Sequence, residues 1–317
     1  MVRGAFLHLP GIGPVRAARL GALGVKAWGE LGSEPPAGLR LGPASWAALL
    51  EAVARCEQAL ADGDIGYLAR ALRGPDLWRL LAAYGERAAF VDLETDGLHH
   101  GARVTVIACL WQGRLHTFVR DENLDDFLDL LPQVELLATF NGASFDVPMI
   151  RNGFHIPELP CAHLDLRWVC YHAGWRGGLK AVESQLGLRR PADLVGVDGA
   201  QAVDLWNCWE QQRSRPHRDL LVRYCAADAV ALRGVAGALL KHCGCPCVWP
   251  AGEAVWSDLN EVLPAPAVAP LRPPPAAAPA APGSSRPAAN PRFANTESAA
   301  RHRLRELLQR RFAQRPE

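Results

Sequence analysis

Two acidic residues stand one position apart in the apolar segment FVDLETDGL, which covers residues 90–98. Side chains alternate between the two faces of a β-strand, so Asp92 and Glu94 are predicted to point to the same face as Phe90. Like charges placed side by side repel each other and resist burial, which calls for water, a basic partner or a metal ion. A solvated acidic pair at a strand edge is the alternative interpretation.

Two further aspartates stand where they could join the same site. Asp146 in FNGASFD falls in the first turn of a predicted helix, where the helix dipole alone would favour a carboxylate. Asp228 lies on a predicted helix, in a stripe that should be buried, and Tyr224 lies one turn before it. Neither lysine nor arginine shares this stripe, and an unpaired buried carboxylate is costly, so Asp228 needs a compensating partner such as a cation.

The composition limits the class of protein that can carry these residues. The chain has 317 residues, 49% of them hydrophobic, which is enough for one large domain or two modest ones. No apolar stretch is long enough to span a bilayer, and the nine scattered cysteines favour a reducing compartment, so we expect a soluble cytoplasmic protein with no membrane partner. The net charge of +1 excludes a uniformly basic nucleic-acid coat but allows a local basic groove.

The periodicity predicts a helical N-terminal region at residues 1–85 and an α/β domain at residues 86–245. The turn at residues 11–14 resembles the hairpin of a helix-hairpin-helix element, and a plain Gly-Pro turn is the alternative. The α/β domain is predicted to contain three strands joined by short turns, then a helix, a strand, a helix opened by Ser144, a short strand and further helices. This order is typical of the ribonuclease-H-like fold, a mixed sheet flanked by helices.

The C-terminal region has a different composition from the rest of the chain. Residues 246–298 are predicted to form a disordered linker rich in proline and alanine, and residues 299–317 a basic amphipathic helix. The arginines of that helix would add salt-sensitive affinity for nucleic acid. Alternatively, its leucine face would dock a protein partner.

Three segments together resemble the exonuclease motifs of the DEDD superfamily, in its tyrosine-bearing subclass. They are DLE at 92–94, NGASFD at 141–146 and YCAAD at 224–228. The histidine subclass would have histidine where this chain has Arg223. Residues 5–242 also resemble the YprB-type ribonuclease-H-like domain family, through ENLDDF, HLDLR and GGLKAVESQLGL among other stretches. The third motif departs from that family at Cys225, where an asparagine is usual.

The resemblance implies a site for two divalent ions, Mg²⁺ or Mn²⁺, which prefer oxygen ligands. Asp92, Glu94 and Asp228 would hold the first ion, and Asp92 with a water-mediated Asp146 would hold the second. Two such ions can clamp a scissile phosphate, one activating water and the other stabilising the departing oxygen. Tyr224 would orient the attacking water, since a phenol with an ordinary pKa of about 10 is a weak base at neutral pH.

Other residues are candidates for contacts around this site. The predicted nucleic-acid contacts are Thr95, Gly97, Asn141, Phe145 and Lys180. Phe145 could stack on a terminal base, and Lys180 could touch a phosphate or be a solvated helix lysine. Asp165 is a candidate for supporting the site or for capping a helix. The cysteines at positions 243, 245 and 247 are too closely spaced for the usual paired zinc ligands.

The sequence therefore predicts a metal-dependent exonuclease that removes nucleotides from the 3′ ends of DNA or RNA. The alternative from another class is a catalytically silent nucleic-acid-binding or scaffold module with the same fold. Retention of four carboxylates and a tyrosine argues against that alternative, because a silent site has no reason to hold repelling acids together. A nuclease of flap or endonucleolytic specificity would use the same metals.

Overall fold

A five-stranded mixed sheet forms the centre of the computed structural model, which describes residues 1–97, 99 and 101–267. The strands are β1 (Ala88–Thr95), β2 (Val104–Trp111), β3 (Arg114–Val119), β4 (Leu136–Thr139) and β5 (Ala162–Asp165). Their order is β3-β2-β1-β4-β5, with antiparallel pairing among the first three and parallel pairing from β1 through β4 to β5. The central strand β1 is therefore the one that carries Asp92 and Glu94.

The short turn that was predicted between the second and third strands is present as a hairpin between β2 and β3. Gln112 and Gly113 have φ angles of 50° and 72°, which suits the tight two-residue turns whose twist matches that of the strands. The adjoining register pairs Trp111 with Arg114. The strand order and the flanking helices confirm the predicted α/β, ribonuclease-H-like fold.

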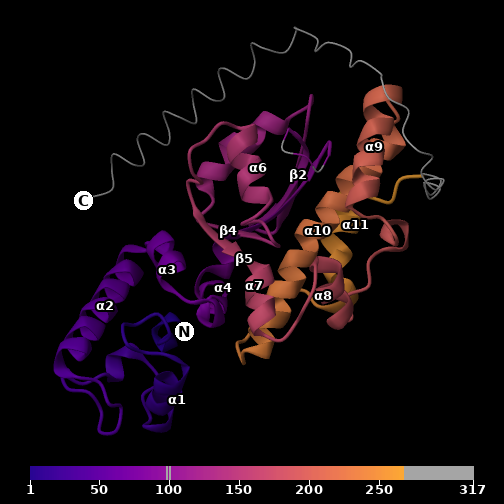
Figure 1. The fold of residues 1–317 in the computed structure, drawn as a ribbon. Coiled ribbons are helices and arrows are strands. Elements are labelled where there is room, and N and C mark those ends of the chain that lie inside the picture. The colour runs from indigo at the N-terminus through magenta and orange to yellow at the C-terminus, as the bar shows by residue number, and fades with distance from the viewer. Residues whose placement is uncertain (98, 100, 268–317) are drawn as a thin grey trace, which may run out of the picture.

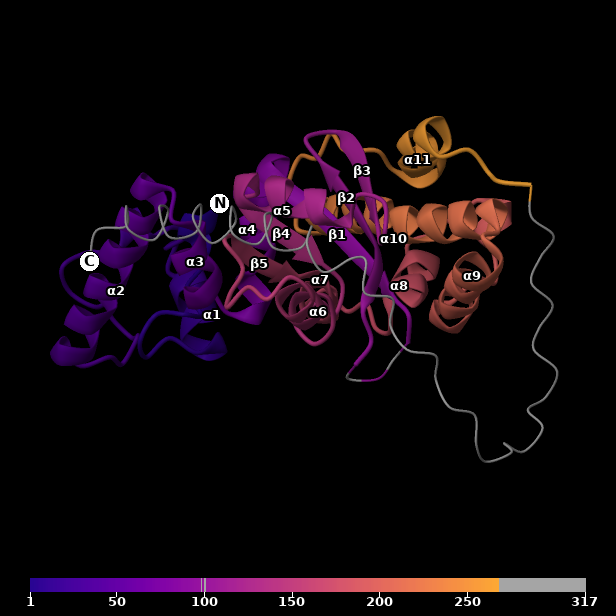
Figure 2. The same ribbon diagram turned by 90° about the horizontal axis from the view of Figure 1, so that it is seen from above.

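Helices cover both faces of the sheet (Figures 1 and 2). They are α5 (Phe127–Leu130), α6 (Asp146–Gly153), α7 (Leu166–His172), α8 (Leu179–Gln185), α9 (Gly199–Gln212) and α10 (Arg215–His242). One buried cluster joins α5 and α6 to one face, through residues such as Val91, Leu93 and Ile150. The other face packs against the long helix α10, which crosses β1 and β2.

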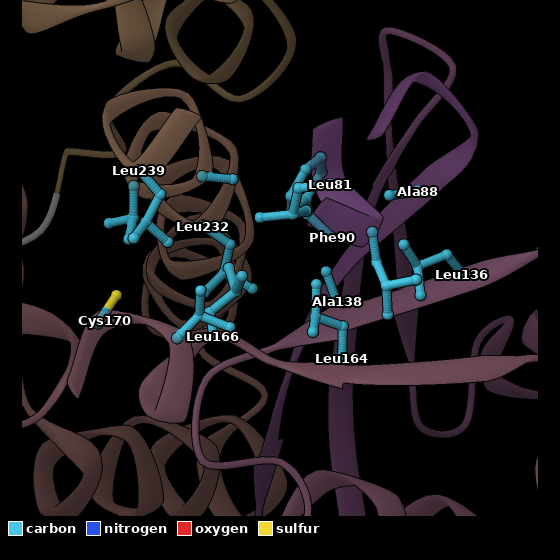
Figure 3. Close-up of a cluster of buried hydrophobic side chains, with 14 of the residues drawn as sticks. Leu81, Ala88, Phe90, Leu136, Ala138, Leu164, Leu166, Cys170, Leu232 and Leu239 are labelled. Carbon is cyan, nitrogen blue, oxygen red and sulfur yellow. The ribbon is translucent and has the colours of Figure 1, made fainter. Parts of the chain in front are cut away.

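Figure 3 shows the apolar core between the sheet and α10. Phe90, Ala138 and Leu164 of three neighbouring strands point toward α7 and α10, where Leu166 and Leu232 lie. All five side chains are buried, and each large one contributes roughly 1.5–3 kcal/mol relative to an exposed position. A polar residue that continues the Phe90 face of β1 must therefore lie against α10.

The N-terminal region is helical, as predicted. Its helices are α1 (Pro14–Ala22), α2 (Pro43–Asp62), α3 (Ile65–Ala71) and α4 (Trp78–Tyr84). Gly11 has a φ of 75° and Pro14 is the first residue of α1, so the predicted tight turn is present. Side chains such as Trp28, Trp46 and Leu81 belong to the same buried cluster as the α10 face of the sheet. In the described part of the chain, no helix has the length and apolarity needed to cross a membrane.

The predicted cap of α6 was wrong. Ser144 was expected to open this helix, but α6 begins at Asp146 with Phe145 in the capping position. The Ser144 hydroxyl instead donates hydrogen bonds to the backbone and side-chain oxygens of Asn141, both at 3.0 Å. A turn therefore separates β4 from α6. The hydroxyl of Ser144, which could have capped the helix, forms hydrogen bonds within this turn instead.

The structure places helical residues inside the first part of the expected linker. The segment of residues 252–262 contains η8 (Gly252–Trp256) and α11 (Ser257–Val262), which pack against α10. The buried guanidinium of Arg223 donates to Asp193 at 2.6 Å, to Asn260 at 2.8 Å and to the carbonyl of Leu263. Most of the expected linker and the predicted helix of residues 299–317 lie outside the described residues.

Replacing Trp256 with alanine is expected to destabilise the protein by about 3–5 kcal/mol, because this side chain is only 2% exposed and a large cavity would remain. Chemical denaturation measures the change in the free energy of unfolding. The matched control Val262→Ala, on the same segment but 53% exposed, should cost less than about 0.5 kcal/mol. A loss below about 1 kcal/mol for Trp256→Ala would show that residues 252–262 do not pack in solution.

Candidate metal centre

The central strand places Asp92 and Glu94 on the face that meets α10. Phe90 belongs to the α10 cluster, whereas Val91 and Leu93 belong to the cluster on the opposite face, so the predicted alternation is confirmed. The pairing with β2 shifts register between Glu94, opposite Val106, and the residue that follows it. Such irregularities bend a strand and re-aim its side chains, and they are frequent beside functional sites.

Helix α10 brings Asp228 to these two carboxylates. Carboxylate oxygens of Asp92, Glu94 and Asp228 all lie within 4.8 Å of one another. Helix and strand touch directly here, because the Cys225 thiol lies 3.4 Å from the carbonyl oxygen of Asp92. Three acids that span 136 positions of the sequence, from 92 to 228, therefore converge from two elements.

The surroundings disfavour three negative charges in the absence of a cation. Burial raises the pKa of Asp92 and of Glu94 well above their ordinary values, and the charges of Asp228 and Asp146 raise them further. Burial also raises the pKa of Asp228, although Arg190 and Lys180 oppose that shift. Oδ2 of Asp92 is a buried acceptor that receives no hydrogen bond from any residue that the structure describes.

Asp146 lies beside this group but is not a member of it. Its side chain is 3% exposed at the start of α6, and burial raises its pKa to about 7. Because its charge raises the pKa values of both Asp92 and Glu94, it is close enough to share their electrostatic environment. The structure therefore brings three of the four predicted carboxylates within direct reach of one ion and sets the fourth next to them.

Tyr224 lies on the same face of α10 and is 4% exposed. Its hydroxyl oxygen accepts a hydrogen bond of 2.9 Å from the ammonium of Lys180 on α8. Burial and the neighbouring Asp228 raise the pKa of the Tyr224 phenol far above its ordinary value, so it keeps its proton. Lys180 also donates to the carbonyl of Val197 at 2.5 Å.

Arg190 and Glu183 lie next to Asp228, although the sequence analysis did not identify either residue as a candidate. The guanidinium of Arg190 donates to Asp228 and also to both oxygens of Glu183, at 2.7 and 2.6 Å. Arg190 and Glu183 side chains are both nearly buried. The expected compensating partner for Asp228 is thus an arginine from outside its helix, and only the tertiary fold reveals it.

Asp165 supports the turn that carries the second motif. Its carboxylate accepts hydrogen bonds from the backbone amides of Asn141 at 2.7 Å and Ala143 at 3.1 Å, and it also caps α7 through the amide of Arg167 at 3.0 Å. Asn141 has a φ of 64°, a conformation that asparagine tolerates better than most residues. Both expected roles of Asp165, support and capping, are therefore present.

The residues that were predicted to contact nucleic acid differ in location and in accessibility. Thr95 is buried at the end of β1, where its hydroxyl donates to the carbonyl of Gly97 at 2.7 Å. Phe145 is partly buried against the α6 side of the sheet. A pocket of about 660 Å³ lies between α8 and the loop of residues 187–198, with Lys180 and Arg190 in its wall. The contacts of these residues with nucleic acid stay predictions.

Cys243, Cys245 and Cys247 do not form a group whose sulfur atoms could bind one metal ion. Cys245 is buried, with its sulfur 3.3 Å from that of Met1. In residues 1–97, 99 and 101–267, the group that satisfies the geometric requirement for an ion is the carboxylate cluster of Asp92, Glu94 and Asp228.

These residues fit a hard divalent cation. The donors are carboxylate oxygens, which Mg²⁺ and Mn²⁺ prefer, and their mutual repulsion is relieved by positive charge. The buried Oδ2 of Asp92 supplies an acceptor that still needs a partner.

Replacing Asp92 with asparagine is expected to stabilise the metal-free protein by about 1–3 kcal/mol at pH 7, because it removes a charge whose buried oxygen receives no hydrogen bond from the described residues. A carboxyl whose pKa is raised on folding binds more protons in the folded state, so stability falls as pH rises above about 4. The gain should therefore be small at pH 4 and grow toward pH 7. Thermal unfolding in EDTA measures it, with Asp204→Asn as an exposed control; no gain, or a loss, at pH 7 would contradict the repulsion argument.

Parts of the chain are similar to known proteins. A family B DNA polymerase from the hyperthermophilic archaeon Pyrobaculum calidifontis is similar at 18% identity and a TM-score of 0.40, over 48% of this chain and 24% of the polymerase chain. This chain thus corresponds to about a quarter of the polymerase chain. The comparison with curated proteins found no match. Residues 89–240, which span β1 to α10, match the family model of the RNase_H superfamily.

Proposed function

We propose that the protein is a metal-dependent nuclease that removes nucleotides from the 3′ ends of DNA or RNA. The observation that carries this proposal is the convergence of Asp92, Glu94 and Asp228 within 4.8 Å. Asp228 is buried and Asp92 and Glu94 are partly buried, so their mutually repelling carboxylates need positive charge. The match of residues 89–240 to the RNase_H superfamily supports nuclease activity of this domain.

The carboxylates are assigned as ligands of two Mg²⁺ or Mn²⁺ ions. Asp92, Glu94 and Asp228 would hold one ion, and Asp92 with a water-mediated Asp146 would hold the other. Four carboxylates carry four negative charges, which equals the charge of two divalent cations. When bound, such ions activate water and stabilise the departing oxygen of a phosphodiester.

Tyr224 is assigned the positioning of the attacking water. Lys180 donates to the phenol oxygen, which leaves the phenol proton for an acceptor such as Asp228 or a water. Because the pKa of Tyr224 is raised, the phenol acts as a hydrogen-bond donor and not as a base at neutral pH.

The nucleic acid is proposed to contact Asn141 and Phe145 from the α6 side of the sheet and Lys180 from the α8 side. Phe145 would stack on a terminal base, and the ammonium of Lys180 at the pocket wall would contact a phosphate. Thr95, at the end of β1, and Gly97, which follows it, are proposed as further contacts.

One observation favours a second function, a catalytically silent nucleic-acid-binding module. Arg190 pairs with Asp228, so one of the proposed ligands already has a cationic partner in the protein. The buried Oδ2 of Asp92 weighs against this alternative, because an arginine paired to Asp228 leaves that oxygen without a donor among the described residues.

The deciding experiment incubates the purified protein with 5′-labelled single- and double-stranded DNA and RNA, in Mn²⁺ or in EDTA. We expect progressive shortening from the 3′ end in Mn²⁺ and none in EDTA. Binding without cleavage of any substrate would favour the silent module. Internal cleavage would retain the nuclease but overturn the proposed end specificity.

A further inference from the structure

Arg190 is a nearly buried residue that has no role in the mechanism proposed above. It follows α8 in the chain, its side chain is 8% exposed, and one guanidinium contacts two acids that are 45 positions apart, Glu183 and Asp228. The contact with Glu183 is a two-pronged ion pair, with Nε on one carboxylate oxygen and Nη2 on the other. Nη2 also donates to Oδ1 of Asp228.

We infer that Arg190, anchored by Glu183, is a positioning residue that orients the carboxylate of Asp228 for metal binding. This inference rests on the proposed function. A planar guanidinium bound at two points has little freedom to rotate, so it fixes the direction of the oxygen that it donates to. Such outer hydrogen bonds orient the ligands of metal sites and tune their affinity.

The charges in the network explain why an arginine can stand beside a metal ligand. The negative charge of Glu183 cancels the positive charge of Arg190, so the pair adds no net charge. Asp228 therefore keeps its own charge for a cation. An arginine without this anchor would place a net positive charge beside the ion that Asp228 is proposed to bind.

Helix α8 also contacts Tyr224, the second functional residue of α10. Lys180 and Glu183 are three positions apart on α8, and Tyr224 and Asp228 are four positions apart on α10, so each pair shares one helix face. Lys180 contacts Tyr224 directly, and Glu183 reaches Asp228 through Arg190. One face of α8 and the arginine that follows it thus support both side chains.

The test compares Mn²⁺ binding by the full-length parent and the double variant Glu183→Gln/Arg190→Gln, in the absence of nucleic acid. The double change keeps the net charge and removes both members of the Glu183–Arg190 pair. Arg190→Gln alone would also leave the buried Glu183 carboxylate without its partner. Arg189→Gln, at the neighbouring and exposed arginine, is the matched control for loss of a distant charge. Calorimetry gives the affinity, and thermal unfolding verifies that each variant is folded.

We expect the double variant to unfold cooperatively near the parent temperature and to bind Mn²⁺ on the order of 10- to 100-fold more weakly. Arg189→Gln should bind like the parent. In the nuclease assay, kcat of the double variant should fall with KM for nucleic acid unchanged, and excess Mn²⁺ should restore part of the loss.

Equal or tighter Mn²⁺ binding by the folded double variant would overturn the positioning role, since equal binding means that Arg190 serves packing alone and tighter binding means that it competes with the ion. A double variant that does not fold would be replaced by Glu183→Gln. That variant keeps Arg190 but removes its anchoring charge, and it should also bind Mn²⁺ more weakly. If the parent itself binds no Mn²⁺, the proposed function fails instead, and the inference fails with it.

Discussion

Asp92→Asn and Asp228→Asn are each expected to lower metal-dependent hydrolysis by at least about 10³-fold. Each change removes a charged oxygen ligand from the cluster in which the three carboxylates lie within 4.8 Å of one another. Charge stabilisation by a bound ion contributes several kcal/mol to the transition state, and every 1.4 kcal/mol corresponds to about tenfold in rate. The rate of mononucleotide release at saturating Mn²⁺ measures the effect.

The control for these variants is Asp204→Asn, at an exposed acid on α9 that should leave the rate within about twofold of the parent. Thermal unfolding must show that all three variants are folded. Hydrolysis by folded Asp92→Asn at the parent rate would remove this carboxylate from the site. The same result with both variants would end the assignment of the carboxylates as metal ligands.

Tyr224→Phe is expected to lower the rate of the chemical step by on the order of 10²-fold while leaving nucleic-acid affinity unchanged. The aromatic ring would keep its place in the core, because its packing on α10 does not depend on the hydroxyl. Lys180 would lose one acceptor but retain the carbonyl of Val197. Single-turnover kinetics at saturating enzyme separate the rate from the affinity.

Tyr171→Phe, at an exposed tyrosine on α7, is the matched control for loss of a hydroxyl. A large loss of affinity with an unchanged rate would move Tyr224 from the mechanism to the substrate-binding face. An unchanged rate and affinity would leave it as a core residue only.

The parts of the fold that depend on local pattern were predictable from the sequence. The segment that carries Asp92 and Glu94 forms the predicted strand, Ala88–Thr95, because alternation of side chains between the two faces of a sheet imposes a period of two. The same alternation set Asp92 and Glu94 on one face. The burial of Asp228 and Tyr224 followed from helical spacing alone.

The contacts between distant segments were not predictable in this way. Arg190 reaches Asp228 across 38 residues because α8 packs against α10, and no periodicity in either segment specifies that packing. The helices at residues 252–262 are too short to show a periodic pattern, although Trp256 and Leu259 are buried. The Ser144 cap failed because a local side-chain hydrogen bond to Asn141 competed with the helix.

The central claim is that these carboxylates bind divalent metal ions, and anomalous diffraction from crystals soaked in Mn²⁺ tests it most directly. The account predicts an anomalous peak at about 2 Å from oxygens of Asp92, Glu94 and Asp228, with a second near Asp92 and Asp146. Crystals of Asp92→Asn should lack both. Mn²⁺ that leaves the carboxylates empty in the parent at saturating concentration, with Arg190 still paired to Asp228, would contradict the account.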